Sequence, residues 1–344
     1  MNQPTICITG GHLTPAIAVI EEIKRRKLPW DIVFVGRSEA FEGGGSPAHE
    51  ERLVRASGVP FHVIVTGRQG LSVWKVPIGL IQSLRLLIKE CPSVVLSFGG
   101  YVGLPVCVAA WMLGIPVIIH EQTGELGFAN RIIAAFARRV LLSSEIGIPL
   151  REALFHPFQK PSFPIGVTRP ILYITGGSTG ARTLNALVFP IISQLCERCT
   201  VIHQVGAADL PSAHKHTEKG YVAAEYFDAS DLAWIYGHTS ILIGRSGANT
   251  VAEACALGVP AIFIPLPWAA GDEQTKNALS LAHEGMAIVL NQKTLTAETL
   301  LGHIGTMMQS LAAYKSHATR VAKMYPREGA VKVVQEIEDI LSRA

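Results

Sequence analysis

Four glycine-bearing turns carry most of the residues that could bind a charged ligand. They read Thr9-Gly10-Gly11-His12, Phe98-Gly99-Gly100-Tyr101, GGSTGAR at 176–182 and GRSGANT at 244–250. Each follows an apolar run and precedes a stretch of helical period, so each is expected where a strand leads into a helix. The first amides of a helix are unpaired and its dipole favours negative charge, so these turns predict phosphate sites. A turn needs glycine whatever its function, so one turn alone is weak evidence.

The fourth turn leads into a predicted helix that Ser246 or Asn249 can cap, and Glu253 lies about one turn inside this helix. A carboxylate there can accept hydrogen bonds from the hydroxyls of a ribose whose diphosphate lies at the helix start. The alternative is that Glu253 only complements the helix dipole. The stretch PLPWAAGDEQTKNA follows the next predicted strand and places Gln274 where it can contact a sugar. The alternative is that this stretch is only a solvated loop. No GxxxxGK[ST] or full GxGxxG motif occurs, which disfavours triphosphate cleavage and typical NAD binding.

The elements that position these turns form a pattern that occurs twice. Short β-branched runs alternate with helical stretches, which is typical of parallel sheets covered on both faces. Strands are predicted near residues 5–9, 31–36, 93–98, 116–120 and 138–142, and again near 170–175, 200–205, 220–224, 240–244, 260–265 and 287–290. We therefore expect an α/β chain with an N-terminal domain at 1–150, a linker at 151–168 and a second domain at 169–325. An amphipathic helix at 326–344 could pack on either domain.

Composition narrows the class of protein. A length of 344 residues fits two domains, and a net charge of +3 is too small to indicate nucleic acid binding. The six cysteines stand in apolar contexts, which favours reduced thiols. The lone Cys196-x-x-Cys199 pair is better explained by core packing than by zinc or redox chemistry. No apolar run is long enough to span a bilayer, and the first residues, MNQPTICITGG, lack a secretory signal, so a cytoplasmic protein is expected.

An ordered set of motifs over nearly the whole chain resembles the MurG family. These motifs are TGGHLTPAIAV at 9–19, SFGGYVGLPVCVAAWMLGIPVIIHEQ at 97–122, ITGGSTGARTLN at 174–185, IHQVG at 202–206, RSGANTVAEACALGVPAIFIP at 245–265 and DEQTKNA at 272–278. The resemblance implies a GT-B fold, in which two Rossmann-like domains with parallel sheets face each other across a cleft. It implies transfer of N-acetylglucosamine from UDP-N-acetylglucosamine to undecaprenyl-diphosphate-linked muramyl-pentapeptide in peptidoglycan synthesis.

The resemblance also implies roles for particular residues. On the donor side, Ser178 would contact a phosphate, Phe227 would meet uracil through its backbone and Gln274 would bind the sugar. The diphosphate and ribose would be held by the helix start, namely Ala248, Asn249, Thr250, Val251, Ala252 and Glu253. On the acceptor side, the loop and its neighbours would be Thr9, Gly10, Gly11, His12, Tyr101, His120, Glu121, Gln122 and Thr123. Arg169 would match the family's diphosphate-binding arginine.

The chain departs from the family pattern in four places, mostly on the acceptor side. The first loop, usually GGTGGH, is reduced to TGGH, and the HEQN motif ends in Thr123. A segment at 41–52, FEGGGSPAHEER, looks like an insertion, and the GNPVR motif is reduced to GVTR at 166–169. These changes put the identity of the acceptor in more doubt than that of the donor.

The expected mechanism needs a base and a site that stabilises the leaving diphosphate. The helix starts near 178–182 and 246–250 would stabilise the developing charge, with inversion at the anomeric carbon and no metal or cofactor. His12 is favoured as the base because of its intrinsic pKa, and Glu121 is the alternative if burial raises its own. His12 would otherwise only contact phosphate or backbone.

A lipid-linked acceptor requires contact with a bilayer. The stretch at 70–90 mixes apolar and cationic residues and suits an interface at the cytoplasmic face of the membrane, with Trp74 and Lys75 as the best contacts. An ordinary half-buried helix is the alternative. Two other functions also stay open: another GT-B enzyme, such as a UDP-N-acetylglucosamine 2-epimerase or a glycolipid synthase, and a non-catalytic UDP-sugar-binding protein. The sequence does not indicate protein partners.

Overall fold

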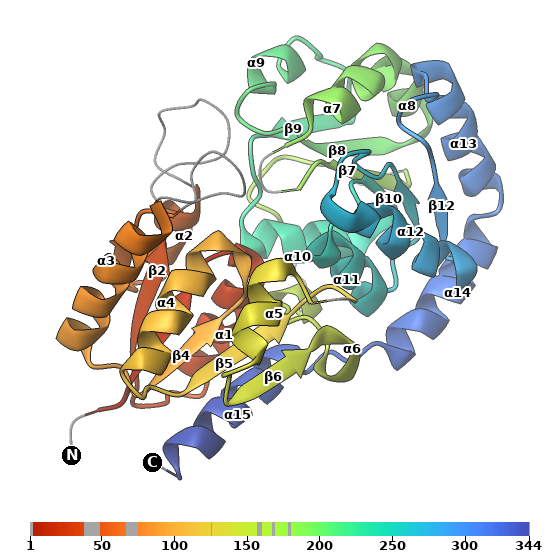
Figure 1. The fold of residues 1–344 in the computed structure, drawn as a ribbon. Coiled ribbons are helices and arrows are strands. Elements are labelled where there is room, and N and C mark those ends of the chain that lie inside the picture. The colour runs from red at the N-terminus through yellow and green to blue at the C-terminus, as the bar shows by residue number, and fades with distance from the viewer. Residues whose placement is uncertain are drawn as a thin grey trace. The chain divides into compact units, whose positions relative to one another are not determined.

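The chain forms two compact units, each built around one parallel sheet (Figure 1). The computed structural model describes residues 3–37, 49–66, 75–124, 126–156, 160–166, 169–177 and 180–343. The first unit comprises Met1–Glu152 with Pro326–Ala344, and the second comprises Ala153–Tyr325. The two units are described separately.

The first unit has a six-stranded sheet in the order β3-β2-β1-β4-β5-β6, and every strand pair is parallel. Its strands are β1 (Thr5–Thr9), β2 (Asp31–Gly36), β3 (Phe61–Val63), β4 (Val94–Ser97), β5 (Val117–Glu121) and β6 (Arg139–Leu142). Its helices are α1 (Leu13–Arg25), α2 (His49–Ala56), α3 (Lys75–Glu90), α4 (Gly100–Met112), α5 (Phe128–Ala134), α6 (Ser143–Ile146) and α15 (Gly329–Leu341).

Alternation along the strands of the first unit divides its core into two layers. In β1, Ile6 and Ile8 pack with α1 and α15 on one face, while Cys7 points to the other face, which is covered by α3, α4 and α5. Successive strand side chains point to opposite faces, so a doubly covered strand is apolar throughout. The sequence left open where the final helix packs, and α15 packs against α1 in the first unit.

The second unit repeats this plan with the sheet order β12-β11-β10-β7-β8-β9. Its strands are β7 (Ile171–Thr175), β8 (Thr200–Gln204), β9 (Tyr221–Ala224), β10 (Thr239–Gly244), β11 (Ala261–Phe263) and β12 (Ala287–Val289). Its α-helices are α7 (Arg182–Val188), α8 (Ile192–Arg198), α9 (Leu210–Ala213), α10 (Ala229–His238), α11 (Ala248–Leu257), α12 (Glu273–His283), α13 (Ala297–Gln309) and α14 (Leu311–Met324). Short 3₁₀ helices are η1 (Glu152–Phe155), η2 (Phe189–Ile191) and η3 (Ala270–Asp272).

The second core is also split by the sheet. Tyr173 and Phe263 pack on the face covered by α10, α11, α12 and α14, whereas Ile174 and Ile262 pack on the face covered by α7, α8 and α13. All eleven predicted strands are present, and within the described ranges the sequence pattern missed only β3, a three-residue edge strand. Counted along each unit, both sheets have the strand order 3-2-1-4-5-6 of a doubly wound fold. Such folds bind ligands beyond the carboxyl ends of the two strands where the order reverses.

Candidate functional site

The four glycine turns lie at the two points where the strand order reverses. In the first unit, Gly10 and Gly11 follow β1, and Gly99 and Gly100 follow its neighbour β4. The two loops touch, because a Cβ on Gly11 would lie 2.3 Å from the Gly99 carbonyl oxygen and one on Gly100 would lie 2.9 Å from the Gly11 Cα. Gly11 and Gly100 also have positive φ angles of 139° and 74°. Only glycine fits this approach, which brings two helix starts together at one sheet edge.

Thr9 ties the ends of β1 and β4 together below these loops. Its side chain is fully buried, and its Oγ1 donates to Ser97 Oγ at 2.9 Å. Ser97 Oγ in turn accepts the backbone N–H of Gly99 at 3.1 Å. The hydroxyl of Thr9 is thus committed to the scaffold, and it holds the glycine loops in register.

His12 is the N-cap residue of α1 and lies half-buried at the same edge of the sheet. Its Nδ1 lies 2.6 Å from Nε2 of Gln122, which follows β5. Burial lowers the pKa of His12 to about 4. The imidazole is therefore neutral near pH 7, as a proton acceptor must be.

Glu121 has an environment different from the one that a base requires. Its Oε1 accepts from Thr123 N at 3.0 Å and Thr123 Oγ1 at 2.7 Å, and its Oε2 accepts from Gly127 N at 3.0 Å and Asn130 Nδ2 at 2.9 Å. Burial alone would raise the pKa of Glu121, but these hydrogen bonds outweigh it and lower the pKa below its ordinary value. The sequence left Glu121 as an alternative base only if burial raised its pKa, and the structure does not meet that condition. Glu121 is an ionised anchor for the loop after β5.

Of the other predicted residues of the first unit, some support the loops and one is exposed. His120 is buried, with its Nε2 3.1 Å from the Gly147 carbonyl oxygen and its ring against Phe98. Thr123 keeps two hydrogen bonds to Glu121 although it replaces the family's asparagine. Tyr101, in the first turn of α4, is 42% exposed and is therefore accessible to a ligand.

Sequence reasoning missed Glu50 of α2. Its carboxylate accepts hydrogen bonds from the backbone N–H groups of Arg37 and Gly11, and a Cβ on Gly10 would lie 2.4 Å from its Oε1. Burial raises the pKa of Glu50, although the positive charge of Arg37 acts to lower it. The local sequence does not predict this contact, because Glu50 looks like an ordinary acidic residue in the first turn of a helix.

In the second unit, the turns after β7 and β10 lie at the corresponding point of the sheet. β7 pairs with β10, and a Cβ on Gly244 would lie 2.7 Å from the Thr175 carbonyl oxygen. The following helix α11 begins with Ala248, Asn249 and Thr250, all half-buried, while Val251 and Ala252 point into or against the core. Its N-cap is Gly247, which has no side chain, so the expectation that Ser246 or Asn249 caps it is wrong. Ser178 lies outside the described residues.

Glu253 lies in the second turn of α11, half-buried, and its Oε2 accepts a hydrogen bond from the Tyr236 hydroxyl at 2.5 Å. This phenol comes from α10 and was not predicted from the sequence. The pair places an oriented carboxylate on the helix whose start carries the unpaired amides.

Two glutamines connect the loops of the second unit. Gln204, at the end of β8, donates to the Gly177 carbonyl oxygen at 3.0 Å and accepts the backbone N–H of Phe227 at 3.2 Å. Phe227 is buried, so only its backbone can take part in binding. The side-chain Oε1 of Gln274 accepts a hydrogen bond from Leu266 N at 3.0 Å. The backbone carbonyl oxygen of Gln274 accepts one from Ser246 Oγ at 2.8 Å. Gln204 therefore joins the loops after β7 and β9, and Gln274 joins those after β10 and β11.

Arg169 is not brought together with these residues. It precedes β7 and so lies at the amino end of that strand, whereas the glycine turns follow the carboxyl ends. Its guanidinium donates to the Cys196 carbonyl oxygen at the end of α8.

Within the ranges that the structure describes, no group of three or more His, Cys, Asp or Glu side chains is arranged to hold a metal ion. Among those same residues, no helix has both the length and the apolar character needed to cross a bilayer.

Comparison with known proteins matches both units to one family. Residues 5–142 match the glycosyltransferase family 28 N-terminal domain, and residues 171–333 match the family 28 C-terminal domain. A relative from Tolumonas auensis is 35% identical over 309 residues, covering 85% of each chain. One from Anaeromyxobacter sp. is 32% identical over 361 residues, covering 96% of this chain and 90% of its own. Both are named UDP-N-acetylglucosamine–N-acetylmuramyl-(pentapeptide) pyrophosphoryl-undecaprenol N-acetylglucosamine transferase.

Solved structures agree. The crystal structure of Acinetobacter baumannii MurG matches with a TM-score of 0.71 at 26% identity, covering 98% of this chain and all of that one. A UDP-GlcNAc 2-epimerase from Neisseria meningitidis matches with a TM-score of 0.65 at 13% identity, which shows a shared fold alone. The chain belongs to glycosyltransferase family 28 and, within it, to the MurG family.

Proposed function

We propose that this protein transfers N-acetylglucosamine from UDP-N-acetylglucosamine to undecaprenyl-diphosphate-linked muramyl-pentapeptide, with inversion and without a metal. The observation that carries the proposal is the pair of glycine-lined strand ends, one in each unit, on a chain at least 32% identical to transferases of that name over most of its length. One site suits a nucleotide diphosphate and the other suits a second diphosphate.

The second unit is the proposed donor site. The amides at the start of α11 would bind the UDP diphosphate, because helix N-termini favour anions and because fixed dipoles stabilise charge that develops as the diphosphate leaves. Glu253 would accept the ribose hydroxyls, the backbone of Phe227 would meet uracil and Gln274 would hold the sugar. The link from Gln204 to both Gly177 and Phe227 supports a phosphate loop and a base pocket that are fixed together.

The first unit is the proposed acceptor site, with His12 as the base. The hydroxyl oxygen of the acceptor attacks the anomeric carbon, the bond to UDP breaks on the opposite side, and the hydroxyl proton passes to the imidazole. A neutral His12 beside the Gly10–Gly11 loop supports this role, and the four hydrogen bonds to Glu121 argue against the alternative. Tyr101 and Gln122 would contact the acceptor.

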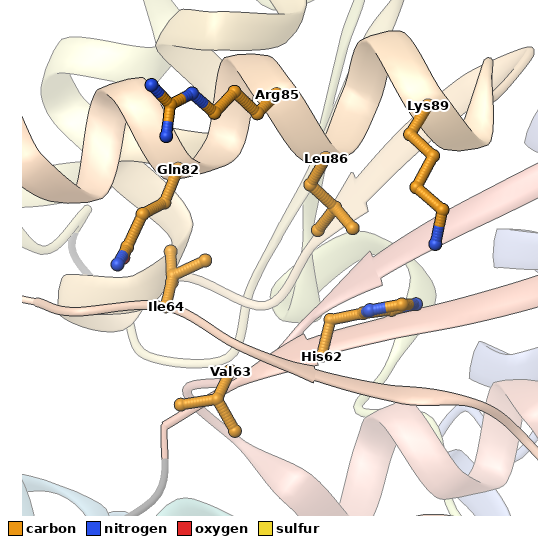
Figure 2. A pocket seen from close by; sticks show the side chains of 7 residues that line it. All are labelled: His62, Val63, Ile64, Gln82, Arg85, Leu86 and Lys89. Atoms are coloured by element: carbon orange, nitrogen blue, oxygen red, sulfur yellow. The ribbon is translucent and has the colours of Figure 1, made fainter.

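A face of α3 is the proposed contact with the cytoplasmic leaflet of the membrane. Ile78, Ile81 and Ile88 are 39%, 52% and 61% exposed and recur with Arg85 at helical spacing, whereas Gly79, Ser83 and Leu87 on the opposite face are buried. Beside them an open cavity between β3 and α3 is lined by His62, Val63, Ile64, Gln82, Arg85, Leu86 and Lys89 (Figure 2). Apolar side chains among cations suit an anionic bilayer surface. Lys75 begins α3, and Trp74 lies outside the described residues.

The membrane proposal is tested by Ile81→Glu in a vesicle co-sedimentation assay. Introducing a carboxylate on this face is expected to reduce binding to vesicles that contain phosphatidylglycerol, because it removes apolar contact and repels the anionic surface. The matched control is Leu279→Glu, which alters a 42% exposed leucine on α12 of the second unit. Equal binding by both variants and the unaltered protein would reject the α3 face.

The transferase proposal is tested by UDP release from UDP-N-acetylglucosamine with and without a lipid-linked muramyl-pentapeptide analogue. Release that needs this acceptor, and that UDP-N-acetylgalactosamine does not support, is the expected result. UDP formed without acceptor would favour a hydrolase or a hydrolysing epimerase, because epimerisation alone releases no UDP. Donor binding with no release under any condition would favour a non-catalytic binding protein.

A further inference from the structure

Tyr236 is a buried phenol that acts on the proposed ribose-binding carboxylate. It is 3% exposed on α10, and its ring packs edge-on against Tyr173 with the centroids 5.4 Å apart. Its hydroxyl lies 2.5 Å from Glu253 Oε2, which is close for a hydrogen bond to a carboxylate. The ring contact fixes the phenol, so the phenol fixes the carboxylate.

The direction of this hydrogen bond is set by burial. Burial raises the pKa of Tyr236 well above its ordinary value, and the neighbouring charge of Glu253 acts in the same sense. The phenol therefore stays protonated and donates the hydrogen bond to Glu253. A glutamate in the second turn of a helix otherwise samples several rotamers, and ordering it on binding costs free energy. Tyr236 removes that cost before the ligand arrives.

We propose that Tyr236 is a positioning residue that aims the Glu253 carboxylate at the ribose, and that the pair makes the donor site selective for ribonucleoside over 2′-deoxyribonucleoside diphosphates. This inference rests on the proposed function, because it assumes that α11 carries the donor nucleotide. The 2′-deoxy analogue keeps the 3′-hydroxyl but removes one hydrogen bond to a carboxylate that is held in place and cannot turn to recover it. A site built to hydrogen-bond a hydroxyl rejects the analogue that lacks it for this reason.

The experiment measures binding of UDP and 2′-deoxy-UDP by isothermal titration calorimetry. The unaltered protein is expected to prefer UDP by about 10- to 100-fold, the value of one hydrogen bond to a charged group. Tyr236→Phe is expected to reduce that preference to about threefold or less while changing affinity for 2′-deoxy-UDP little. Glu253→Gln should reduce the preference as well. The matched control is Tyr221→Phe, which deletes another phenol of the same unit that lies 3.0 Å from His203 Nδ1, and it should keep the preference.

Four results overturn the inference. Equal weakening of both nucleotides by Tyr236→Phe would mean a purely structural phenol, and an unchanged preference would mean that Tyr236 does not act on the ribose contact. UDP binding without any preference in the unaltered protein would overturn this inference alone. No UDP binding at all would overturn the proposed function with it. Far-ultraviolet circular dichroism shows whether each variant is folded.

Discussion

Replacing Glu121 with glutamine separates an anchoring role from a catalytic one. The carboxylate accepts two hydrogen bonds on each oxygen, including one backbone N–H on each, from Thr123 and Gly127. A glutamine has one accepting oxygen, so in either orientation its NH₂ group meets a backbone N–H. At least one hydrogen bond to a charged group is lost, worth about 1.5–3 kcal/mol. The loop after β5 should then open roughly 10- to 150-fold more often.

Amide hydrogen exchange at Thr123 and Gly127 measures this opening directly. The expected result is exchange faster by that factor in Glu121→Gln, with no change in Glu145→Gln, which alters an exposed acid of α6 in the same unit. Because the folded pKa of Glu121 is lowered, its stabilisation is complete above the unfolded value of about 4.3 and is lost as pH falls through the folded pKa. Unchanged exchange together with turnover reduced roughly 10²- to 10⁴-fold would refute the anchor and make Glu121 the base.

Two further predictions concern the acceptor loop. His12→Ala should lower kcat roughly 10²- to 10⁴-fold with the KM for the donor unchanged. In the unaltered enzyme, any loss of activity at low pH that is due to His12 should occur near its pKa of about 4. Unchanged turnover in the variant would exclude His12 as the base. Gly11→Ala places a Cβ 2.3 Å from the Gly99 carbonyl oxygen and should raise the acceptor KM while UDP affinity stays the same. Gly114→Ala, at a positive φ of 70° with nothing within 4 Å, is its control, and equal effects of the two would mean that φ strain, not the clash, matters.

The strands and glycine turns could be predicted from the sequence because their signals are local. Apolar runs such as the one at β1 bury both faces of a strand, and glycine is required where two loops approach as closely as those at Gly11 and Gly99. All four turns lie where the strand order reverses because β1 pairs with β4 and β7 pairs with β10. The sequence does not reveal this pairing. The resemblance to one family supplied the roles.

Contacts between distant residues could not be predicted. Glu50 reaches the Gly11 amide from α2, Tyr236 reaches Glu253 from α10, and Asn130 satisfies Glu121 from α5. Each is a hydrogen bond whose donor and acceptor are ordinary residues in their own segments. The direction of the Glu121 pKa shift could not be predicted for the same reason, since burial was visible in an apolar strand but the four donors were not. Arg169 matches the family motif in sequence and lies before β7, whereas the glycine turns follow the strands.

The most direct test of the proposed transfer is analysis of the lipid product. The protein is incubated with UDP-α-N-acetylglucosamine and the undecaprenyl-diphosphate-linked muramyl-pentapeptide, and the product is examined by mass spectrometry and by NMR of the new anomeric proton. The account predicts one added N-acetylglucosamine in a β linkage, made with a metal chelator present. An α linkage, a product that forms only with added metal, or an unmodified lipid beside bound UDP-sugar would contradict it.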